Sequence, residues 1–428
     1  KGDAEYASAF KRMKPLLKVA HDRYDRFECE GFTFLVYPQA KDYGRMEREI
    51  DAECAAHPGR PLFVLDHVPP ANTVYNSSHG GDHRTRKIFD RHPEVIALSG
   101  HVHGSQMHEG KIWQGGFTAV GSGTIKQQAC PGAGGRFHVT VLDLTKDRAV
   151  FHRYDISSGE ELDPDHPWTL VFPYDPKNAP YSLANRRAAA PVPAFAADAA
   201  VEVRAEGSPI RQVTVRFPAA KTKGVSHYEV LVEAKTADGW KVRSRERVMA
   251  DYVMPPRKQK AFFEARFVSG FFDPDETVRF AVRPIDFFGT VGKRIEKEFA
   301  IGATEKWKTL YDGVPTPAKP GQYRKFRGNT VFGVPPSAMD VPDGTRMRIV
   351  LDVALDMADT SAASFNLRTN KTIKYAFGYI YTPSGKSDLR YVREFSRPSE
   401  RSEDYNLHLQ RALGGRILFR RVRIECRE

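Results

Sequence analysis

The chain has 428 residues, of which 41% are hydrophobic and 28% charged, and its formal net charge is +12. This length exceeds what one ordinary core contains, so we expect two to four domains. No run of 18 or more apolar residues predicts a membrane span. Lysine and arginine are spread along the chain, which favours a solvated basic surface over a nucleic-acid-binding face. The four cysteines form no CxxC pair and indicate neither a zinc ribbon nor a dense disulfide framework.

The first part of the chain alternates helical and buried-strand patterns. A helical spacing of apolar residues over 43–57 is followed by the apolar run Leu62–Leu65, which ends at "DHVPP". A short helix is predicted over 83–93, and "VIALSG" at 95–100 is a second buried strand. Strand, helix and strand in this order predict an α/β unit, and antiparallel strands follow it.

Three regions follow the α/β part. The alanine- and proline-rich residues 186–200 are a predicted linker, so the first domain is expected at 1–185. Short alternating runs over 201–303 predict a β-sandwich, and "RFAVRPIDFFGTVGK" resembles a strand and turn of fibronectin type III domains. Residues 304–428 resemble a jelly-roll sandwich in their strand pattern. The expected fold class is a truncated α/β domain followed by two all-β sandwiches.

Histidines gather where the two buried strands end. Eight of the 14 lie between His57 and His108. His67 and His101 each follow a buried strand, and ligands of open α/β sheets gather at the carboxyl ends of the strands. If the backbone stays extended through Val102, His103 points to the same side as His101. Imidazoles converging in this way suit zinc, iron, nickel or manganese.

The motifs "LFVLDHVPP" and "LSGHVHG" resemble those of the calcineurin-like metallophosphoesterases, over a region that extends to about residue 155. The resemblance implies hydrolysis of a phosphate ester by two divalent or trivalent ions, zinc, manganese or iron. It implies that His67 and His101 share one ion and that His103 binds the other. No catalytic residue beyond the ligands is identified.

The loop after His67 is a second candidate region. In the family it often contacts substrate, which makes Asn72, His79 and His83 candidate substrate-binding residues; an exposed polar loop is the alternative. The other histidines have simpler predictions. We expect His57, His92 and His108 at the surface and His138 and His152 at ordinary strand positions.

The chain departs from the family upstream of His67. The family's motifs D-x-H, GD-x-x-D and GNH are absent there, and three neutral imidazoles cannot hold two cations together without anionic bridging ligands. We therefore expect that the sequence begins downstream of the GNH motif and that this chain holds a partial centre at most. The sandwiches appended to the α/β part suggest export to the periplasm, cell surface or exterior, by analogy alone.

A non-catalytic alternative remains open. In it the two sandwiches bind a glycan or a protein, and the α/β part is inert. Aromatic residues at 375, 377, 379 and 381 alternate along one strand, which suits either a sugar-stacking platform or ordinary core packing.

Overall fold

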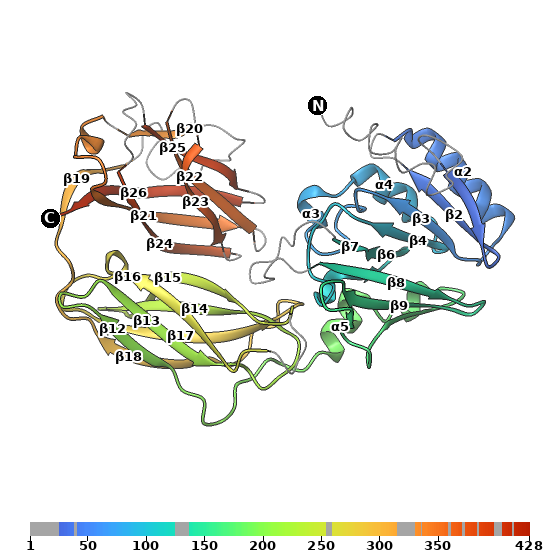
Figure 1. Ribbon diagram of the computed structural model, residues 1–428, viewed down its shortest axis with the longest axis horizontal. Helices are drawn as coiled ribbons and strands as arrows, with labels where there is room; N and C mark the ends of the chain where they lie inside the picture. The colour runs from blue at the N-terminus through green and yellow to red at the C-terminus, as the bar shows by residue number, and fades with distance from the viewer. Residues whose placement is uncertain are drawn as a thin grey trace. The chain divides into compact units, whose positions relative to one another are not determined.

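The computed structural model shown in Figure 1 describes most of the chain. The described residues are 25–37, 41–124, 137–253, 259–314, 330–334, 336–357, 361–369, 373–382, 385–397, 405–412 and 415–428. Only the backbone is described at residues 25, 79, 124, 330–334, 336, 339, 361–369, 373–382, 405–412, 415 and 416. The chain forms two compact units. Unit 1 extends to residue 191 and takes in 251–259 and 286–290; unit 2 contains 192–250, 260–285 and 291–428.

A mixed six-stranded sheet lies at the centre of unit 1. Its order is β1-β2-β3-β4-β6-β5, with β2, β3, β4 and β6 parallel and with β1 and β5 antiparallel at the edges. The strands are β1 (Asp25–Cys29), β2 (Phe32–Tyr37), β3 (Leu62–Asp66), β4 (Val95–Ser99), β5 (Ile112–Gln114) and β6 (Thr118–Gly121). The carboxyl ends of β3 and β4 therefore meet at one edge of the sheet.

Helices cover one face of this sheet, because alternate strand residues turn apolar side chains toward them. Helices α2 (Tyr43–Ala56) and α4 (His83–Phe89) contribute to the core on this face. Unit 1 also contains the short helices α3 (Ser77–Gly80) and α5 (Leu183–Ala189). The Asp42 side chain accepts a hydrogen bond from the backbone N–H of Arg45 and caps α2. Met46, Ile50 and Cys54, one turn apart, are buried against the sheet. The predicted alternation of strands and helices over 43–100 is confirmed.

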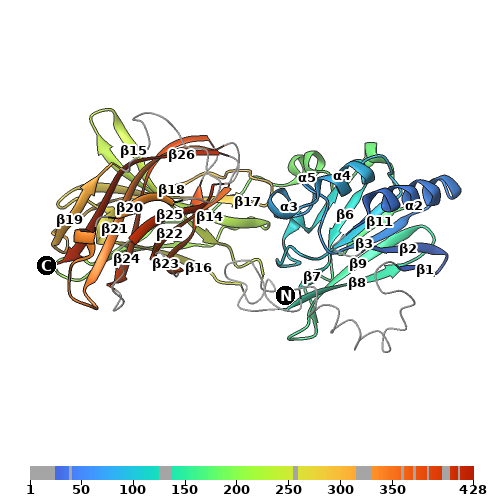
Figure 2. The ribbon, with the colours of Figure 1, turned by 90° about the horizontal axis from the view of Figure 1, so that it is seen from above.

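The opposite face packs on a second sheet, which gives unit 1 three layers (Figure 2). Phe63 and Ile96 point away from the helices and pack with Phe151 and Trp168 of the second sheet. That sheet contains β7 (Gly123–Thr124), β8 (His138–Leu144), β9 (Arg148–Asp155), β10 (Glu160–Glu161) and β11 (Trp168–Val171). The antiparallel portion predicted after the α/β part is present, and β8 and β9 form its hairpin.

The predicted linker over 186–200 is partly helical. Helix α5 begins after Ser182, whose side chain accepts a hydrogen bond from the N–H of Asn185, and it ends at Ala189. The alanines in this stretch favour a helix, and the unit boundary lies just beyond it, between residues 191 and 192.

Two β-sandwiches make up most of unit 2. The first contains β12 (Glu202–Glu206), β13 (Gln212–Pro218) and β16 (Phe262–Val268) in one sheet, and β14 (Val225–Thr236), β15 (Gly239–Met249), β17 (Thr277–Asp286) and β18 (Ile295–Ala300) in the other. Residues from both sheets, including Phe217, Val230, Phe267 and Phe280, share one buried core.

The second sandwich has two four-stranded sheets. One has the order β19-β26-β21-β24 and the other β20-β25-β22-β23. Their strands are β19 (Trp307–Gly313), β20 (Thr330–Val334), β21 (Arg346–Met357), β22 (Ser361–Thr369), β23 (Ile373–Thr382), β24 (Gly385–Ser396), β25 (Tyr405–Ala412) and β26 (Gly415–Arg427). The aromatic side chains at 375, 377, 379 and 381 lie outside the described part of the chain, so the glycan-platform hypothesis stays a prediction.

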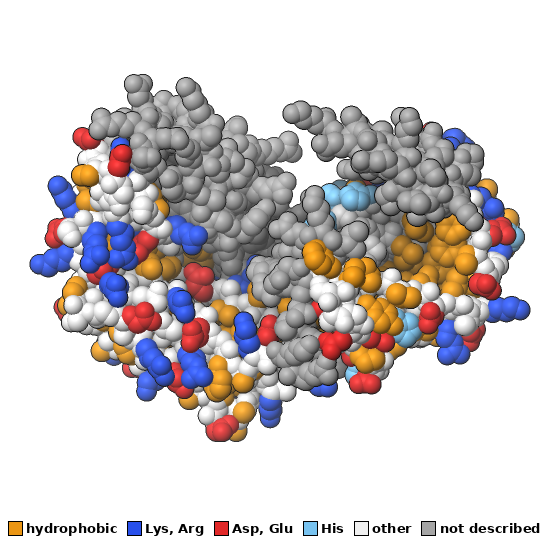
Figure 3. Space-filling view, in the orientation of Figure 1, with side chains coloured by type: hydrophobic (Ala, Val, Ile, Leu, Met, Phe, Trp, Pro, Cys, Tyr) orange, Lys and Arg blue, Asp and Glu red, His pale blue; other side chains and the backbone are white. Residues whose placement is uncertain are grey.

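Charges on the face drawn in Figure 3 are interspersed, with basic and acidic side chains alternating. Several arginines pair with carboxylates, as Arg279 does with Glu233 at 2.5 Å and Arg283 with Glu229 at 2.6 Å. Among the described residues no helix is long and apolar enough to cross a membrane.

Candidate metal site at the carboxyl ends of the parallel strands

His67 and His101 meet at the edge of the central sheet. Each lies just beyond the end of its strand, β3 or β4, and these strands are parallel neighbours with Asp66 opposite Ser99. Nε2 of His67 is 3.2 Å from Nδ1 of His101, and the rings are T-shaped with centroids 5.1 Å apart. The structure therefore brings together the two imidazoles that were predicted to share an ion.

His101 reaches this position through a turn, so the predicted extended backbone is wrong. Its φ is +58°, a left-handed conformation that is uncommon for a residue with a side chain. The N–H of Val102 donates to the carbonyl of Gly100 at 2.6 Å, and the N–H of His103 donates to that of His101 at 3.1 Å. Val102 is buried beneath the turn, which leaves His101 exposed and His103 half-buried. Strain of this kind is common at functional sites.

The three histidines interact electrostatically. Partial burial lowers the pKa of His67, and the neighbouring His101, His103 and Lys41 lower it further. A lowered pKa favours the neutral imidazole, which is the form that binds a metal. His103 is therefore close enough to His67 to affect its charge, but the three histidines do not form a compact group of ligand atoms. Within the described part of the chain, the one group of three residues whose ligand atoms all lie within 4.8 Å of one another is Cys54, His92 and Glu94.

Gly80, the last residue of α3, approaches the His101 ring. A Cβ at this position would lie 3.3 Å from Nε2 of His101 and 3.4 Å from its Cδ2. The absence of a side chain therefore gives the imidazole room beside α3.

Buried polar groups hold the loop that carries His101 and His103. The ammonium of Lys111, only 1% exposed, donates to the carbonyl of Val102 at 2.5 Å. His138 is fully buried, and its Nδ1 accepts from the N–H of Gln106 at 3.1 Å. Arg153 donates to the carbonyl of Gln106 at 3.3 Å. His138 thus anchors this loop, and the prediction that it is an ordinary strand residue missed that role.

Lys41 engages two carboxylates of this region, Asp66, which precedes His67, and Asp82. The buried Lys41 ammonium donates to Asp66, to Asp82 at 2.9 Å and to Thr85 at 2.9 Å. Burial raises the pKa of Asp66 in spite of Lys41. For Asp82, burial acts in the same direction, but hydrogen bonds from Lys41 and Tyr43 hold its pKa well below the usual range. Both carboxylates therefore bind the Lys41 ammonium and do not bridge two ions.

Nε2 of His67 and Nδ1 of His101 lie within hydrogen-bond distance of each other, and their separation is also one that two ligands of a single ion would have. Two nitrogens bound at about 2.0–2.1 Å to a tetrahedral zinc ion lie roughly 3.3 Å apart, close to the observed 3.2 Å. A second ion would need anionic bridging ligands. Among the described residues, Asp66 and Asp82 do not supply them.

The predicted substrate-binding residues lie in the loop and helices between β3 and β4. Asn72 is exposed, has a φ of +56° and accepts a hydrogen bond from Arg86 at its carbonyl. His83 is the exposed first residue of α4. His79 lies in α3, and its side chain is outside the described part of the chain. Nothing in these positions tests substrate contact, so the assignment stays a prediction.

The remaining histidines differ from one another. His57 is at the surface, as predicted. His108 is buried and stacks near Tyr75 with ring centroids 4.0 Å apart, so its predicted surface position is wrong. His92 is half-buried and bonded to Asp51, and His152 pairs with Glu161 at 2.7 Å.

Sequence reasoning missed Lys41, Lys111 and the Cys54–His92–Glu94 group. Nothing in the sequence around the two lysines predicts their burial, because a single lysine in a polar stretch is ordinarily expected at the surface. For the third group a weak signal existed, since Cys54 belongs to the buried face of α2 and His92 and Glu94 flank Pro93.

Comparison with known proteins assigns no family. No protein-family model matches the chain, and no curated protein matches it. Among solved structures, chitinase ChiA74 from Bacillus thuringiensis is similar with a TM-score of 0.17 and 8% sequence identity, over 81% of this chain and 62% of that chain. At that score the likeness carries no argument about fold or activity.

Proposed function

We propose that unit 1 carries the histidine part of a metal-dependent phosphoesterase site. The observation that carries the proposal is the 3.2 Å approach of His67 and His101 at the ends of parallel strands. Supporting it are the left-handed backbone of His101 and the buried contacts that hold its loop. Rigid support of this kind is what a metal site needs from the residues behind its ligands.

A bound divalent ion would supply Lewis-acid polarisation of a phosphoryl oxygen. The residues of this chain orient the two imidazoles and favour the neutral form of His67, and His103 lies near them for a second ion. Because Lys41 engages Asp66 and Asp82, we expect the chain to bind one ion through His67 and His101 and to hydrolyse phosphate esters slowly.

For the two sandwiches of unit 2 we propose the fold types that the sequence predicts, a fibronectin type III-like module and a jelly roll. The first sandwich has three and four strands in its sheets, in the orders β12-β13-β16 and β15-β14-β17-β18, which supports a fibronectin type III-like module. The eight strands of the second sandwich, divided into two four-stranded sheets with alternating order, support a jelly roll.

The site is tested on the whole chain with three variants. His67→Gln and His101→Gln remove one ligand each, and His166→Gln is the matched control because it changes an exposed histidine of unit 1 outside the candidate site. After incubation with manganese or zinc and gel filtration, we expect each ligand variant to retain one ion fewer than wild type and the control to retain the wild-type content.

Hydrolysis of bis(p-nitrophenyl) phosphate supplies the second readout. We expect slow, metal-dependent hydrolysis by wild type and by His166→Gln. Both ligand variants should lose at least tenfold in rate, which corresponds to about 1.4 kcal/mol of transition-state stabilisation. Unchanged metal content in the ligand variants would overturn the ligand assignment. Wild-type hydrolysis no faster than that of His67→Gln and His101→Gln would overturn the phosphoesterase proposal.

A further inference from the structure

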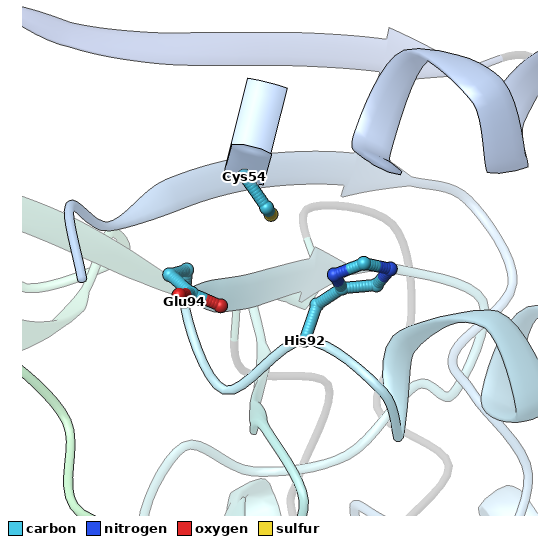
Figure 4. Close-up of side chains that lie close together, drawn as sticks. All are labelled: Cys54, His92 and Glu94. Atoms are coloured by element: carbon cyan, nitrogen blue, oxygen red, sulfur yellow. The ribbon is translucent and has the colours of Figure 1, made fainter. Parts of the chain in front are cut away.

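We propose that Cys54, His92 and Glu94 bind a zinc ion at a second site in unit 1. Their ligand atoms all lie within 4.8 Å of one another (Figure 4). Cys54 lies in the last turn of α2, and His92 and Glu94 lie on either side of Pro93 in the segment between α4 and β4. The cluster therefore connects a helix end to the start of a central strand.

His92 is prepared as a ligand by its neighbour. Its Nε2 lies 2.8 Å from Oδ1 of Asp51, one helical turn before Cys54. When Nε2–H donates to this carboxylate, the lone pair is left on Nδ1, and Figure 4 shows one ring nitrogen facing Cys54 and Glu94 while the other faces away. Zinc-binding histidines commonly have such a carboxylate partner, which orients the ring and selects the tautomer.

Glu94 is held by the backbone around it. Its Oε1 accepts a hydrogen bond from the N–H of Gly59 at 3.1 Å, and its carbonyl accepts one from Leu62 at 2.9 Å. These bonds fix the side chain while its second carboxylate oxygen keeps the capacity to bind an ion. Two of the three ligands thus have outer partners.

Cys54 supplies the ligand that selects the metal. It is a free cysteine, 9% exposed. Thiolate, imidazole and carboxylate together suit zinc in preference to magnesium or calcium, which favour oxygen ligands alone. Asp51 and Glu94 give the pocket negative charge, which a divalent cation would offset.

The distances are within reach of a tetrahedral ion. Ligand atoms bound at about 2.0–2.3 Å lie roughly 3.3–3.8 Å apart, so a contraction of about 1 Å from the 4.8 Å limit closes the site. With three protein ligands, the fourth position falls to water. Zinc bound here would join α2 to the α4–β4 segment.

This site is distinct from the His67–His101 pair and does not rest on the proposed function. His92 and Glu94 precede β4, whereas His101 follows it, and a five-residue strand is about 16 Å long. The two sites also differ in chemistry, because only the second contains a thiolate.

Cobalt substitution distinguishes the sites. Thiolate bound to Co²⁺ gives a charge-transfer band in the near ultraviolet that imidazole ligands do not give. We expect this band in the full-length wild-type chain loaded with Co²⁺, its loss in Cys54→Ser, and its persistence in the thiol controls Cys29→Ser and Cys130→Ser. His67→Gln should keep the band, so failure of the histidine-pair proposal would leave this result unaffected.

Two further variants protect the test from a folding defect. Glu94→Gln and His92→Gln keep Cys54 in place. We expect each to weaken zinc affinity at least tenfold in a competition titration with a chromophoric chelator. The exposed control His166→Gln should retain the wild-type affinity. A cobalt band that survives Cys54→Ser, or a folded wild-type chain with bound Co²⁺ and no band, would overturn the proposal.

Discussion

The ammonium of Lys111 lies 2.5 Å from the carbonyl oxygen of Val102, the residue between His101 and His103. The lysine is buried, and glycines at 104 and 121 leave room for its side chain: a Cβ on either would lie 3.2 Å or 2.9 Å from it. A charged group beneath the turn thus holds the backbone that places both imidazoles.

Replacing Lys111 with methionine should loosen this turn. The Val102 carbonyl loses a charged donor inside the protein, which costs about 1–3 kcal/mol of unfolding free energy. We expect metal affinity at His67 and His101 to fall about tenfold, because the turn that places His101 loses its support. Urea unfolding and metal titration measure the two effects. Lys87→Met, at an exposed position on α4, is the control, and equal behaviour of the two variants would contradict the role of Lys111.

Lys41→Met tests the buried charge cluster beside His67. The substitution leaves Asp66 and Asp82 close together without their shared cation. Breaking a buried ion pair from one side costs about 3–5 kcal/mol, and we expect a loss of that order in urea unfolding. The double variant Lys41→Met/Asp66→Asn removes one of the two stranded charges and should recover part of the stability. A loss under about 1 kcal/mol in the single variant would show that solvent reaches the cluster.

Gly81→Ala should distort the loop between β3 and α4. A Cβ at this position would lie 2.3 Å from the carbonyl oxygen of Ser77 and 2.6 Å from Cα of Ala71, and both are backbone atoms that cannot turn aside. We expect a loss of at least about 2 kcal/mol in unfolding free energy, in the range of overpacked sites. Gly44→Ala in α2 is the matched control. Its nearest contacts are side-chain atoms at 3.5 Å, so helix propensity should leave it neutral or slightly more stable.

His227 predicts an acid dependence for the stability of unit 2. Burial, followed by the charge of Arg247, lowers the pKa of His227 to about 4 in the folded state, although Glu229 opposes the shift. The unfolded chain, with a pKa near 6.5, binds the proton first, so stability falls as the pH drops from about 6.5 to about 4.

The expected size of this loss is up to about 3 kcal/mol, from about 1.4 kcal/mol per pKa unit. It is measured as the difference in unfolding free energy between wild type and His227→Gln at pH 7 and pH 4.5. Burial raises the pKa of Glu246 to about 7, which acts in the opposite sense, but this residue is present in both proteins and cancels in the difference. A difference that is constant with pH would contradict the lowered pKa of His227.

Local pattern predicted the elements around the candidate site well. Apolar spacing alone identified α2 and the buried strands β3 and β4, because a residue's side of a helix or strand follows directly from its place in the repeat. The same logic placed His67 and His101 at neighbouring strand ends. It predicted the wrong backbone for His101, since a left-handed turn depends on what lies beneath Val102.

The sequence by itself determined the alternation of helices and strands, the β-rich second half and the pair of strand-end histidines, because each depends on short-range periodicity. Only the tertiary structure decided which polar residues are buried together. Lys111 reaches Val102 across nine residues, Lys41 reaches Asp82 across 41, and Cys54 comes close to Glu94 across a helix end and a strand start. Such contacts arise because parallel strands and their covering helices bring distant segments side by side, and no local spacing encodes them.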